Sequence, residues 1–347
     1  KPSGLLDYRT MHEQARSALA ELGHEEIDSR IQCGKVGIGQ QQMVEIAKAV
    51  SLDAKLIIMD EPTSSLGKQE VEQLMKTVRR LKEKGIAILF VSHKLEELFE
   101  LCERVTVMRD GAHILTDDVK NMTRDTLIQA MVGRTLDNLF PKVYGTKGEC
   151  FLKVEHLKEA GVLHDVSFEA YGGQILGVAG LVGAGRTETM RAIFGADVLD
   201  SGKIYVKGRE VHIRQPKDAI REGLAFLTED RKGQGLVLSQ PVQTNLILAS
   251  MRLFRRGPFL RRARIRDNSE RRVHSLRIKT PTIDEVVAQL SGGNQQKVVI
   301  GKWINTEADV YIFDEPTRGI DVGAKIEVYN VMNDLVRQGK CVIMVSS

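Results

Sequence analysis

Short apolar runs alternate along the chain with stretches of helical spacing, a pattern typical of α/β proteins. Apolar runs of strand length occupy Leu56–Met59, Ile86–Val91 and Ile175–Ala179. Between the first two runs, apolar residues recur at helical spacing from Val71 to Leu81, so we expect a helix that buries one face there. Strands and helices of these lengths in alternation predict a mainly parallel sheet with helices on both faces.

The same pattern predicts further elements around these strands. Helices are expected at Met11–Leu22, Gln41–Val50 and Thr187–Ile193, and the second of them follows a Gly-rich turn. The segments Val105–Met108 and His113–Leu115 flank an Arg-Asp-Gly sequence, which is a hairpin signal.

The most informative feature of the chain is a repeat. Lys55–Ser64 reads Lys-Leu-Ile-Ile-Met-Asp-Glu-Pro-Thr-Ser, and Asp309–Arg318 reads Asp-Val-Tyr-Ile-Phe-Asp-Glu-Pro-Thr-Arg. The offset of 254 residues from Asp60 to Asp314 also relates Gly39 to Gly293, Gln42 to Gln296, Lys48 to Lys302, Pro62 to Pro316, Gly85 to Gly339 and Ser92 to Ser346. A register that continues over this distance without a gap predicts a duplicated domain rather than a short solenoid repeat.

Each copy of the repeat is an apolar run that ends in two adjacent carboxylates. This order predicts a buried strand followed by charge at its carboxyl end, where open parallel sheets bind their ligands. The first acid of each pair, Asp60 or Asp314, suits a water-mediated hold on a phosphate-bound Mg²⁺. The second acid, Glu61 or Glu315, is placed to polarise an attacking water. We therefore expect two nucleotide sites, or the remains of two.

A glycine-rich loop joins the predicted strand Ile175–Ala179 to the helix expected from Thr187. It fits the phosphate-loop pattern G-x-x-x-x-G-K-[ST], except that Arg replaces Lys. The residues expected to contact phosphate are Gly180, Gly183, Ala184, Gly185, Arg186 and Thr187. Backbone N–H groups in such a loop can cradle phosphates, and the Thr187 hydroxyl can ligate Mg²⁺. Because Arg is a bulky planar fork where Lys is a compact charge, we expect binding to survive and efficient hydrolysis to suffer. The alternative is a Gly-rich turn with no ligand.

Two short motifs precede the carboxylate pairs at equal distances. Leu290-Ser-Gly-Gly-Asn294 stands before Asp314 as Val36-Gly-Ile-Gly-Gln40 stands before Asp60. With these motifs the chain resembles the ATP-binding subunit of an ATP-binding cassette (ABC) importer. The signature residues that the resemblance implies are Ser291, Gly292, Gly293, Gly37, Gly39 and Gln40. Each motif is expected to open a helix whose amino end approaches a γ-phosphate bound by the opposite domain.

The resemblance implies an α/β fold of two tandem P-loop NTPase cassettes, each with a helical subdomain. We expect the C-terminal part of a first cassette at residues 1–138, a Pro- and Gly-containing linker at 139–150 and a second cassette at 151–347. The offset places the first phosphate loop before residue 1, and the chain stops directly after the strand-like Val342–Val345. We therefore expect a fragment that is cut at both ends and whose first cassette is incomplete.

A histidine after the second strand adds to the resemblance. His93 stands where the family has its switch histidine, which contacts the γ-phosphate, whereas the matching residue of the second copy is Ser347. Gly37 likewise cannot donate the hydrogen bond expected from Ser291.

These departures sort into two composite sites if the halves face head to tail, as cassettes do. One site would combine Asp60, Glu61 and His93 with Ser291–Gly293. The other would combine the Arg186 loop, Asp314 and Glu315 with the weak motif at Gly37–Gly39, and it would collect every substitution. We expect hydrolysis at the first site and binding without efficient turnover at the second.

The second half most resembles importers of the ribose, galactoside and xylose type. The resemblance is carried by Gly-Leu-Val-Gly-Ala-Gly-Arg-Thr-Glu and by Thr228–Lys232, in which Glu229 stands where other cassettes have Gln. It implies ATP and Mg²⁺ as cofactors, a membrane permease dimer as partner and a periplasmic or lipid-anchored sugar-binding protein. It also implies a peripheral position on the cytoplasmic face of the bacterial inner membrane. Glu229–Asn245 is the candidate coupling surface, and an exposed polar loop is the alternative.

Composition narrows these expectations. The formal net charge of +4 is too small to indicate a nucleic-acid partner, and no apolar run approaches the roughly 20 residues of a membrane span. The four cysteines lack metal-ligand spacing and fit reduced thiols of a cytosolic protein. Nine arginines crowd Arg252–Arg272, which fits either a solvated helix face or contact with anionic lipid or a partner subunit.

Three other classes of function stay open at this point. A soluble tandem ATPase that acts on ribosomes or nucleic acid would also carry duplicated Asp-Glu-Pro-Thr motifs. A nucleoside importer would share the layout. A non-catalytic nucleotide-binding regulator is the third class, because the absence of a first phosphate loop would produce one in this fragment as it stands.

Overall fold

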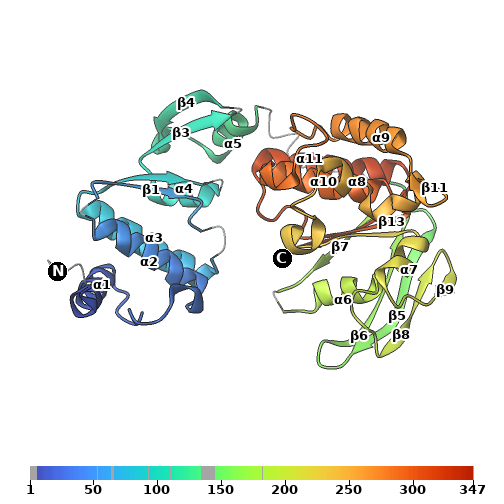
Figure 1. Cartoon of the computed structure of the whole chain (residues 1–347), viewed down its shortest axis with the longest axis horizontal. Helices are drawn as coiled ribbons and strands as arrows, with labels where there is room; N and C mark the ends of the chain where they lie inside the picture. The colour runs from blue at the N-terminus through green and yellow to red at the C-terminus, as the bar shows by residue number, and fades with distance from the viewer. Residues whose placement is uncertain are drawn as a thin grey trace. The chain divides into compact units, whose positions relative to one another are not determined.

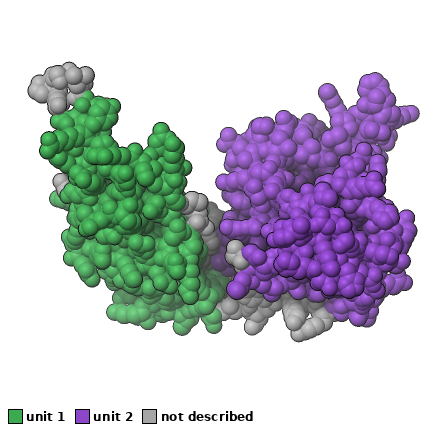
Figure 2. Space-filling view, turned by 90° about the horizontal axis from the view of Figure 1, so that it is seen from below, with its two compact units in different colours: residues 1–134 green, residues 135–347 purple. Residues whose placement is uncertain are grey.

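The computed structural model describes residues 6–346 except positions 53, 64, 65, 93, 110, 134–144 and 182, and it does not describe the Ile38 side chain. The chain forms two compact units, Lys1–Arg134 and Thr135–Ser347, which are coloured separately in Figure 2.

The first unit pairs two parallel strands with helices and ends in a small hairpin domain. Its elements are α1 (Tyr8–Leu22), α2 (Ile38–Val50), β1 (Leu56–Asp60), α3 (Lys68–Glu83), β2 (Ala87–Val91), α4 (Leu95–Leu101), β3 (Arg104–Arg109), β4 (Ala112–Asp118) and α5 (Arg124–Val132), with short 3₁₀ turns η1 (Cys33–Lys35) and η2 (Val119–Asn121). β1 pairs with β2 in parallel, and β3 pairs with β4 as the predicted antiparallel hairpin.

Helix α3 shows why the predicted periodicity folds as it does. Leu74 and Leu81 on its inner face are completely buried, within a core that also contains Met59 of β1. The Glu70 carboxylate accepts a hydrogen bond from the Gly67 backbone N–H at 2.8 Å, which caps the first turn. The helix is therefore fixed by one buried face and one cap.

Helix α2 begins three residues earlier than the sequence pattern predicted. Gly37 is its N-cap residue, in extended conformation, so the helix starts at Ile38 rather than Gln41. The prediction was wrong because Gly39 was assigned to the turn, although a glycine is tolerated in the first turn of a helix. A Cβ at Gly39 would meet the Glu70 carboxylate, so a larger residue there would require the flexible Glu70 side chain to move.

The second unit contains two four-stranded sheets. Its elements are β5 (Cys150–Glu159), β6 (Leu163–Tyr171), β7 (Ile175–Ala179), α6 (Arg186–Ile193), β8 (Ser201–Val206), β9 (Arg209–Val211), α7 (Pro216–Arg221), β10 (Leu224–Leu227), the π-helical turn η4 (Arg231–Gly235), α8 (Val242–Ile247), η5 (Leu248–Phe254), β11 (Arg255–Arg256), β12 (Phe259–Leu260), α9 (Arg262–Ser275), η6 (Val287–Gln289), α10 (Gly292–Ile304), β13 (Val310–Asp314), α11 (Val322–Arg337) and β14 (Cys341–Ser346).

The parallel sheet has the strand order β10-β13-β14-β7 and carries the candidate site at its carboxyl end. Helix α6 lies on one side of it, and α10 and α11 lie on the other, so the predicted helices on both faces are confirmed (Figure 1). The second sheet, β6-β5-β8-β9, is antiparallel and was not predicted. The described end of the predicted linker is attached to this unit, because the Gly148 N–H donates to the Gly172 carbonyl and the Gly172 N–H donates to the Glu149 carbonyl.

The sequence repeat is also a repeat of structure. α2, β1, α3 and β2 recur as α10, β13, α11 and β14 with the same 254-residue offset at both ends of each helix. The strand register is shared as well, since Asp60 lies opposite Val91 and Asp314 lies opposite Val345. Corresponding sequences therefore fold into corresponding elements in both units.

Within the described part of the chain, no helix is both long enough and apolar enough to cross a bilayer. All four cysteines are free thiols, and burial raises the pKa of Cys341 to about 12.

Candidate functional site

The predicted glycine loop follows β7 and ends in the first turn of α6. Gly183 has a φ of +83° and Gly185 a φ of +78°, backbone angles that L-residues with a side chain rarely adopt. Gly185 is the N-cap residue of α6, so the unpaired N–H groups of the first helical turn face the loop. The strand–loop–helix context that phosphate loops require is thus present, although Val182 lies outside the described residues.

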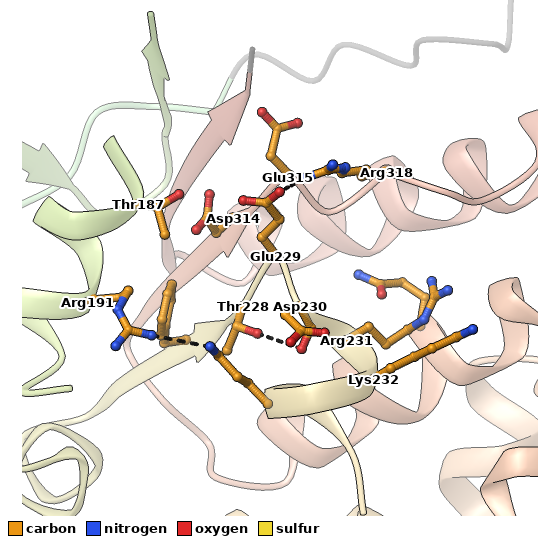
Figure 3. Close-up of a pocket in the computed structure, with 13 residues that line it drawn as sticks. Thr187, Arg191, Thr228, Glu229, Asp230, Arg231, Lys232, Asp314, Glu315 and Arg318 are labelled. Atoms are coloured by element: carbon orange, nitrogen blue, oxygen red, sulfur yellow. Dashed lines mark hydrogen bonds and ion pairs between the residues drawn. The ribbon is translucent and has the colours of Figure 1, made fainter. Parts of the chain in front are cut away.

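Asp314 ends β13 and is almost completely buried, with 1% of its surface exposed. Neither of its carboxylate oxygens has a hydrogen-bond partner within the described structure. Burial raises the pKa of Asp314, and the neighbouring Thr187 hydroxyl acts in the opposite direction while the Glu315 charge adds to the rise. Thr187 and Asp314 lie next to each other at the end of the strand (Figure 3). A buried pair of oxygens without a donor, beside a hydroxyl, fits a hard cation such as Mg²⁺.

Glu315 follows directly and has an unusual backbone conformation. Its φ is +43°, and its N–H donates to the Val345 carbonyl at 3.0 Å. Arg186 brings its guanidinium to this carboxylate, with Nη1 at 3.7 Å from Oε1, and both side chains are largely buried. The aliphatic part of Arg186 lies over Gly180, where a Cβ would be 3.4 Å from the Arg186 Cδ. Arg186 therefore connects the glycine loop to the second acid of the pair.

A cavity of about 520 Å³ opens beside these residues. It is lined by Thr187, Arg191, Phe226, Thr228, Glu229, Asp230, Arg231, Lys232, Gln234, Gln296, Asp314, Glu315 and Arg318, most of which are labelled in Figure 3. The cavity thus brings together four predicted residues from three separate segments: Thr187, Glu229, Asp314 and Glu315.

The other nine lining residues were not predicted as site residues, and three of them stand out by their contacts or burial. Arg318 forms an ion pair with Glu229. Gln296 donates from Nε2 to the Pro316 carbonyl at 3.0 Å. Arg231 is mostly buried, burial lowers its pKa, and its Nε has no partner in the described structure. The repeat could have indicated Gln296 as a site residue, because it pairs Gln296 with Gln42. Nothing in the local sequence indicated the Glu229–Arg318 pair.

The signature residues Ser291, Gly292 and Gly293 are not among the lining residues and lie at the amino end of α10. Ser291 is the N-cap residue but makes no side-chain cap, and its hydroxyl instead accepts a hydrogen bond from the Asn294 side chain at 2.9 Å. A Cβ at Gly292 would be 3.1 Å from the Arg231 guanidinium, and one at Gly293 would be 3.0 Å from the Ala324 Cβ. Both signature motifs open helices, as predicted, since Gly37, Gly39 and Gln40 occupy the same place at α2.

The first unit holds the other carboxylate pair. Asp60 ends β1 and Glu61 follows with a φ of +44°, and the Glu61 N–H donates to the Val91 carbonyl at 2.8 Å. Both acids are exposed. His93 and Ser347, the two residues predicted to differ between the sites, lie outside the described residues.

The segments on either side of position 93 are held by a buried carboxylate. Glu97 accepts hydrogen bonds from the Thr63 hydroxyl at 2.6 Å and the Ser92 hydroxyl at 2.8 Å, and Lys94 bonds the Thr63 carbonyl at 3.0 Å. These bonds join the loop after the Asp60–Glu61 pair to the end of β2. The loop that follows the carboxylate pair is therefore fixed by hydrogen bonds to Ser92, Lys94 and Glu97.

Comparison with known proteins gives a consistent result. The family model described as "ABC transporter" matches residues 4–64 and 163–318. A ribose import ATP-binding protein of Geobacillus kaustophilus is 46% identical over 99% of this chain and 70% of its own length. A second one, from Rubrobacter xylanophilus, is 48% identical over 99% of this chain and 69% of its own length.

Solved structures agree on the fold. A nucleotide-free ATP-binding cassette from an ABC transporter matches with a TM-score of 0.50 and 19% identity over 57% of this chain and 81% of its own. An archaeal ribosome recycling factor, solved with a ribosomal stalk protein, matches with a TM-score of 0.56 and 21% identity over 96% of this chain and 62% of its own. At these identities the likeness concerns the fold alone.

Proposed function

The chain belongs to the ABC transporter family, and we propose that it is the ATP-hydrolysing, energy-coupling subunit of a carbohydrate import complex. The observation that carries this proposal is the identity of 46–48% to ribose import ATP-binding proteins over 99% of the chain. The match spans both units and so covers the positions of both carboxylate pairs and both signature motifs.

The geometry of the second unit supports a role for each site residue in ATP binding. The backbone N–H groups at the start of α6 and the Arg186 guanidinium would bind phosphate oxygens. Thr187 and Asp314 would hold Mg²⁺, which when bound neutralises charge on the phosphates. Glu229 lines the same cavity and is held by Arg318. These groups position a nucleotide and compensate its charge, which is most of what phosphoryl transfer requires from a protein.

We further propose that the chain is part of a tandem cassette with two unequal composite sites. Asp60, Glu61 and His93 act with Ser291–Gly293, and Glu61 is the residue that polarises the attacking water. The Arg186 loop, Asp314 and Glu315 act with Gly37–Gly39. In this second site Glu315, which would otherwise orient water, forms an ion pair with Arg186.

The imported molecule in this proposal is a monosaccharide of the ribose, galactoside or xylose type. The partners are a membrane permease dimer and, through it, a periplasmic or lipid-anchored sugar-binding protein. The subunit acts from the cytoplasmic face of the membrane as a peripheral protein. The coupling surface is Glu229–Asn245, which begins at the cavity and continues through η4 into α8.

Reconstitution tests the function as a whole. The product of the complete reading frame is expressed with a permease gene from the same genomic neighbourhood and purified into proteoliposomes. We expect co-purification, and we expect ATP hydrolysis to rise when a loaded sugar-binding protein is added. Robust hydrolysis that ignores permease and sugar but responds to ribosomes or nucleic acid would favour the soluble class instead.

A further inference from the structure

The segment between the cavity and α9 has a strongly one-sided charge. From Arg231 to Arg266 the sequence contains no aspartate or glutamate. The basic residues of this stretch are Arg231, Lys232, Arg252, Arg255, Arg256, Arg261, Arg262, Arg264 and Arg266. The six from Arg252 to Arg264 are all exposed. The cavity and the mechanism use none of these six.

The arginines concentrate on a short hairpin. β11 pairs with β12 so that Arg255 lies opposite Leu260 and Arg256 lies opposite Phe259, and Gly257 turns the chain with a φ of +59°. Phe259 is 75% exposed and Leu260 is 44% exposed. The hairpin lies at the outer edge of the second unit, beside α9 (Figure 1). An exposed aromatic residue thus stands between two pairs of arginines.

The hairpin is anchored without these outward side chains. Phe254, just before it, is buried with Ile247 of α8 and Ile265 of α9. The Arg261 N–H donates to the Phe254 carbonyl at 2.9 Å and closes the base. Phe259 and Leu260 are not part of this small core, so the hairpin does not depend on their side chains for its anchoring.

Ion pairing separates the hairpin arginines from those further along α9. Arg271 pairs with Asp267 at 3.1 Å, and Arg266 lies 3.9 Å from both Glu270 and Asp284. In the part of the chain that the structure describes, no carboxylate pairs with Arg255, Arg256, Arg261 or Arg262. Their charges face solvent without compensation.

We propose that the β11–β12 hairpin docks on an anionic lipid surface. Arginines attract the headgroups of acidic lipids, and the exposed aromatic and aliphatic side chains of β12 suit the boundary between headgroups and acyl chains. Charge alone would equally fit nucleic acid, but the exposed Phe259 and Leu260 add an apolar contact that a phosphate backbone does not supply. The surface places the second unit against the membrane independently of any permease contact.

Vesicle flotation of the complete protein, without nucleotide, tests this surface. We expect binding to vesicles of phosphatidylcholine with phosphatidylglycerol and little binding to phosphatidylcholine alone. The double variant Arg255→Gln/Arg256→Gln should bind on the order of 30-fold more weakly, since each arginine near an anionic surface contributes about fivefold. The matched control is Arg221→Gln/Arg271→Gln, which removes the same charge from exposed arginines already paired with Asp218 and Asp267. The control should bind within about twofold of the wild type.

A reporter variant separates lipid from other anionic partners. Phe259→Trp keeps the aromatic surface, and the native Trp303 is only 7% exposed, so a blue shift of emission on anionic vesicles reports burial at position 259. The proposal is overturned if emission does not shift, if both double variants lose binding equally, or if only permease-containing vesicles are bound. It is also overturned if RNA binds as tightly and shifts the emission equally. ATP hydrolysis, measured in parallel without lipid, should be unchanged in all these variants, so loss of the lipid result leaves the proposed function intact.

Discussion

The ends of β1 and β13 carry the same residues in the same geometry but in different surroundings. Glu61 and Glu315 have φ values of +44° and +43°, and each donates its N–H to the neighbouring parallel strand. Yet Asp60 is exposed, whereas Asp314 is 1% exposed and its pKa is raised by burial. Local backbone geometry is therefore set by the local sequence, and burial and electrostatics are set by the neighbours.

The neighbours that matter are strands. β13 lies between β10 and β14, and all five of its residues are buried. In the described part of the first unit β1 pairs with β2 alone, which leaves Ile58 64% exposed and Leu89 54% exposed. Apolar runs such as Leu56–Met59 are typical of strands covered on both faces. In the described structure the two carboxylate pairs thus differ in burial because β13 has a strand on each side and β1 has one neighbour.

The largest effect that we expect from this difference is on the rate of ATP hydrolysis. Glu61→Gln should reduce ATP hydrolysis by the complete protein by about 10²–10³-fold, because it removes the group that we propose polarises the attacking water. Glu315→Gln should reduce it by less than about threefold, because Glu315 is already paired with Arg186. Steady-state phosphate release at saturating ATP gives the comparison.

The same pair of variants can contradict the assignment. Equal losses at both positions would make the two sites equivalent. A loss confined to Glu315→Gln would reverse their roles. Nucleotide binding, followed by a fluorescent ATP analogue, should persist in both variants and controls for misfolding.

A smaller effect is expected on nucleotide affinity in the second unit. Arg186→Gln should weaken binding at this site by about 10–100-fold, because a charge-assisted bond to phosphate is lost. Arg337→Gln is the matched control, since Arg337 is exposed and pairs with Asp334 three residues away on α11. Calorimetric titration with ATP measures both. An unchanged affinity in Arg186→Gln would mean that Arg186 serves Glu315 and not the phosphates.

The signature motifs offer a finer comparison. Ser291→Ala should lower turnover by about tenfold, which corresponds to one hydrogen bond to a charged group. Gly37→Ser introduces the missing hydroxyl at the matching position and should change turnover by less than about twofold, because the proposal assigns Gly37 to the weaker site with Arg186. Single-turnover hydrolysis separates these effects from binding. A larger effect at Gly37 than at Ser291 would break the proposed head-to-tail assignment.

The sequence predicted the elements of the parallel sheet because their apolar runs are local and strong. Strands Leu56–Asp60 and Ile175–Ala179 were predicted within one residue, and both signature helices were expected at their motifs. The antiparallel sheet was missed because its strands, such as β5, are irregular. β5 changes register against β6 at Val154/Leu157, which disrupts the alternation that a strand prediction needs.

The candidate site was only partly predictable for a similar reason. Thr187, Asp314 and Glu315 follow from motifs that lie on single segments. The ion pairs from Glu229 to Arg318 and from Arg186 to Glu315 join segments that are 89 and 129 residues apart (318 less 229, and 315 less 186). No local pattern encodes such contacts; they arise once the sheet brings the strand ends together.

The smallest expected effect concerns stability and follows from the burial of Asp314. Asp314→Asn removes a buried charge whose oxygens have no hydrogen-bond partner in the described structure, and it should raise the free energy of unfolding of the nucleotide-free second unit at neutral pH by about 1 kcal/mol. Asp60→Asn is the matched control, because Asp60 is exposed in the same strand geometry, and it should change stability very little. Urea unfolding of each variant, without nucleotide or Mg²⁺, measures both.

The pH dependence of the same variant identifies the cause. Because the folded pKa of Asp314 lies above its ordinary value of 3.8, the folded state takes up a proton first as the pH falls. The cost of burying the charge is therefore full above the raised pKa, shrinks between that pKa and 3.8, and is absent below 3.8. The advantage of Asn over Asp should follow the same course and vanish in acid. If the advantage instead stays constant across this range, side-chain packing and not the buried charge separates Asp314 from Asp60.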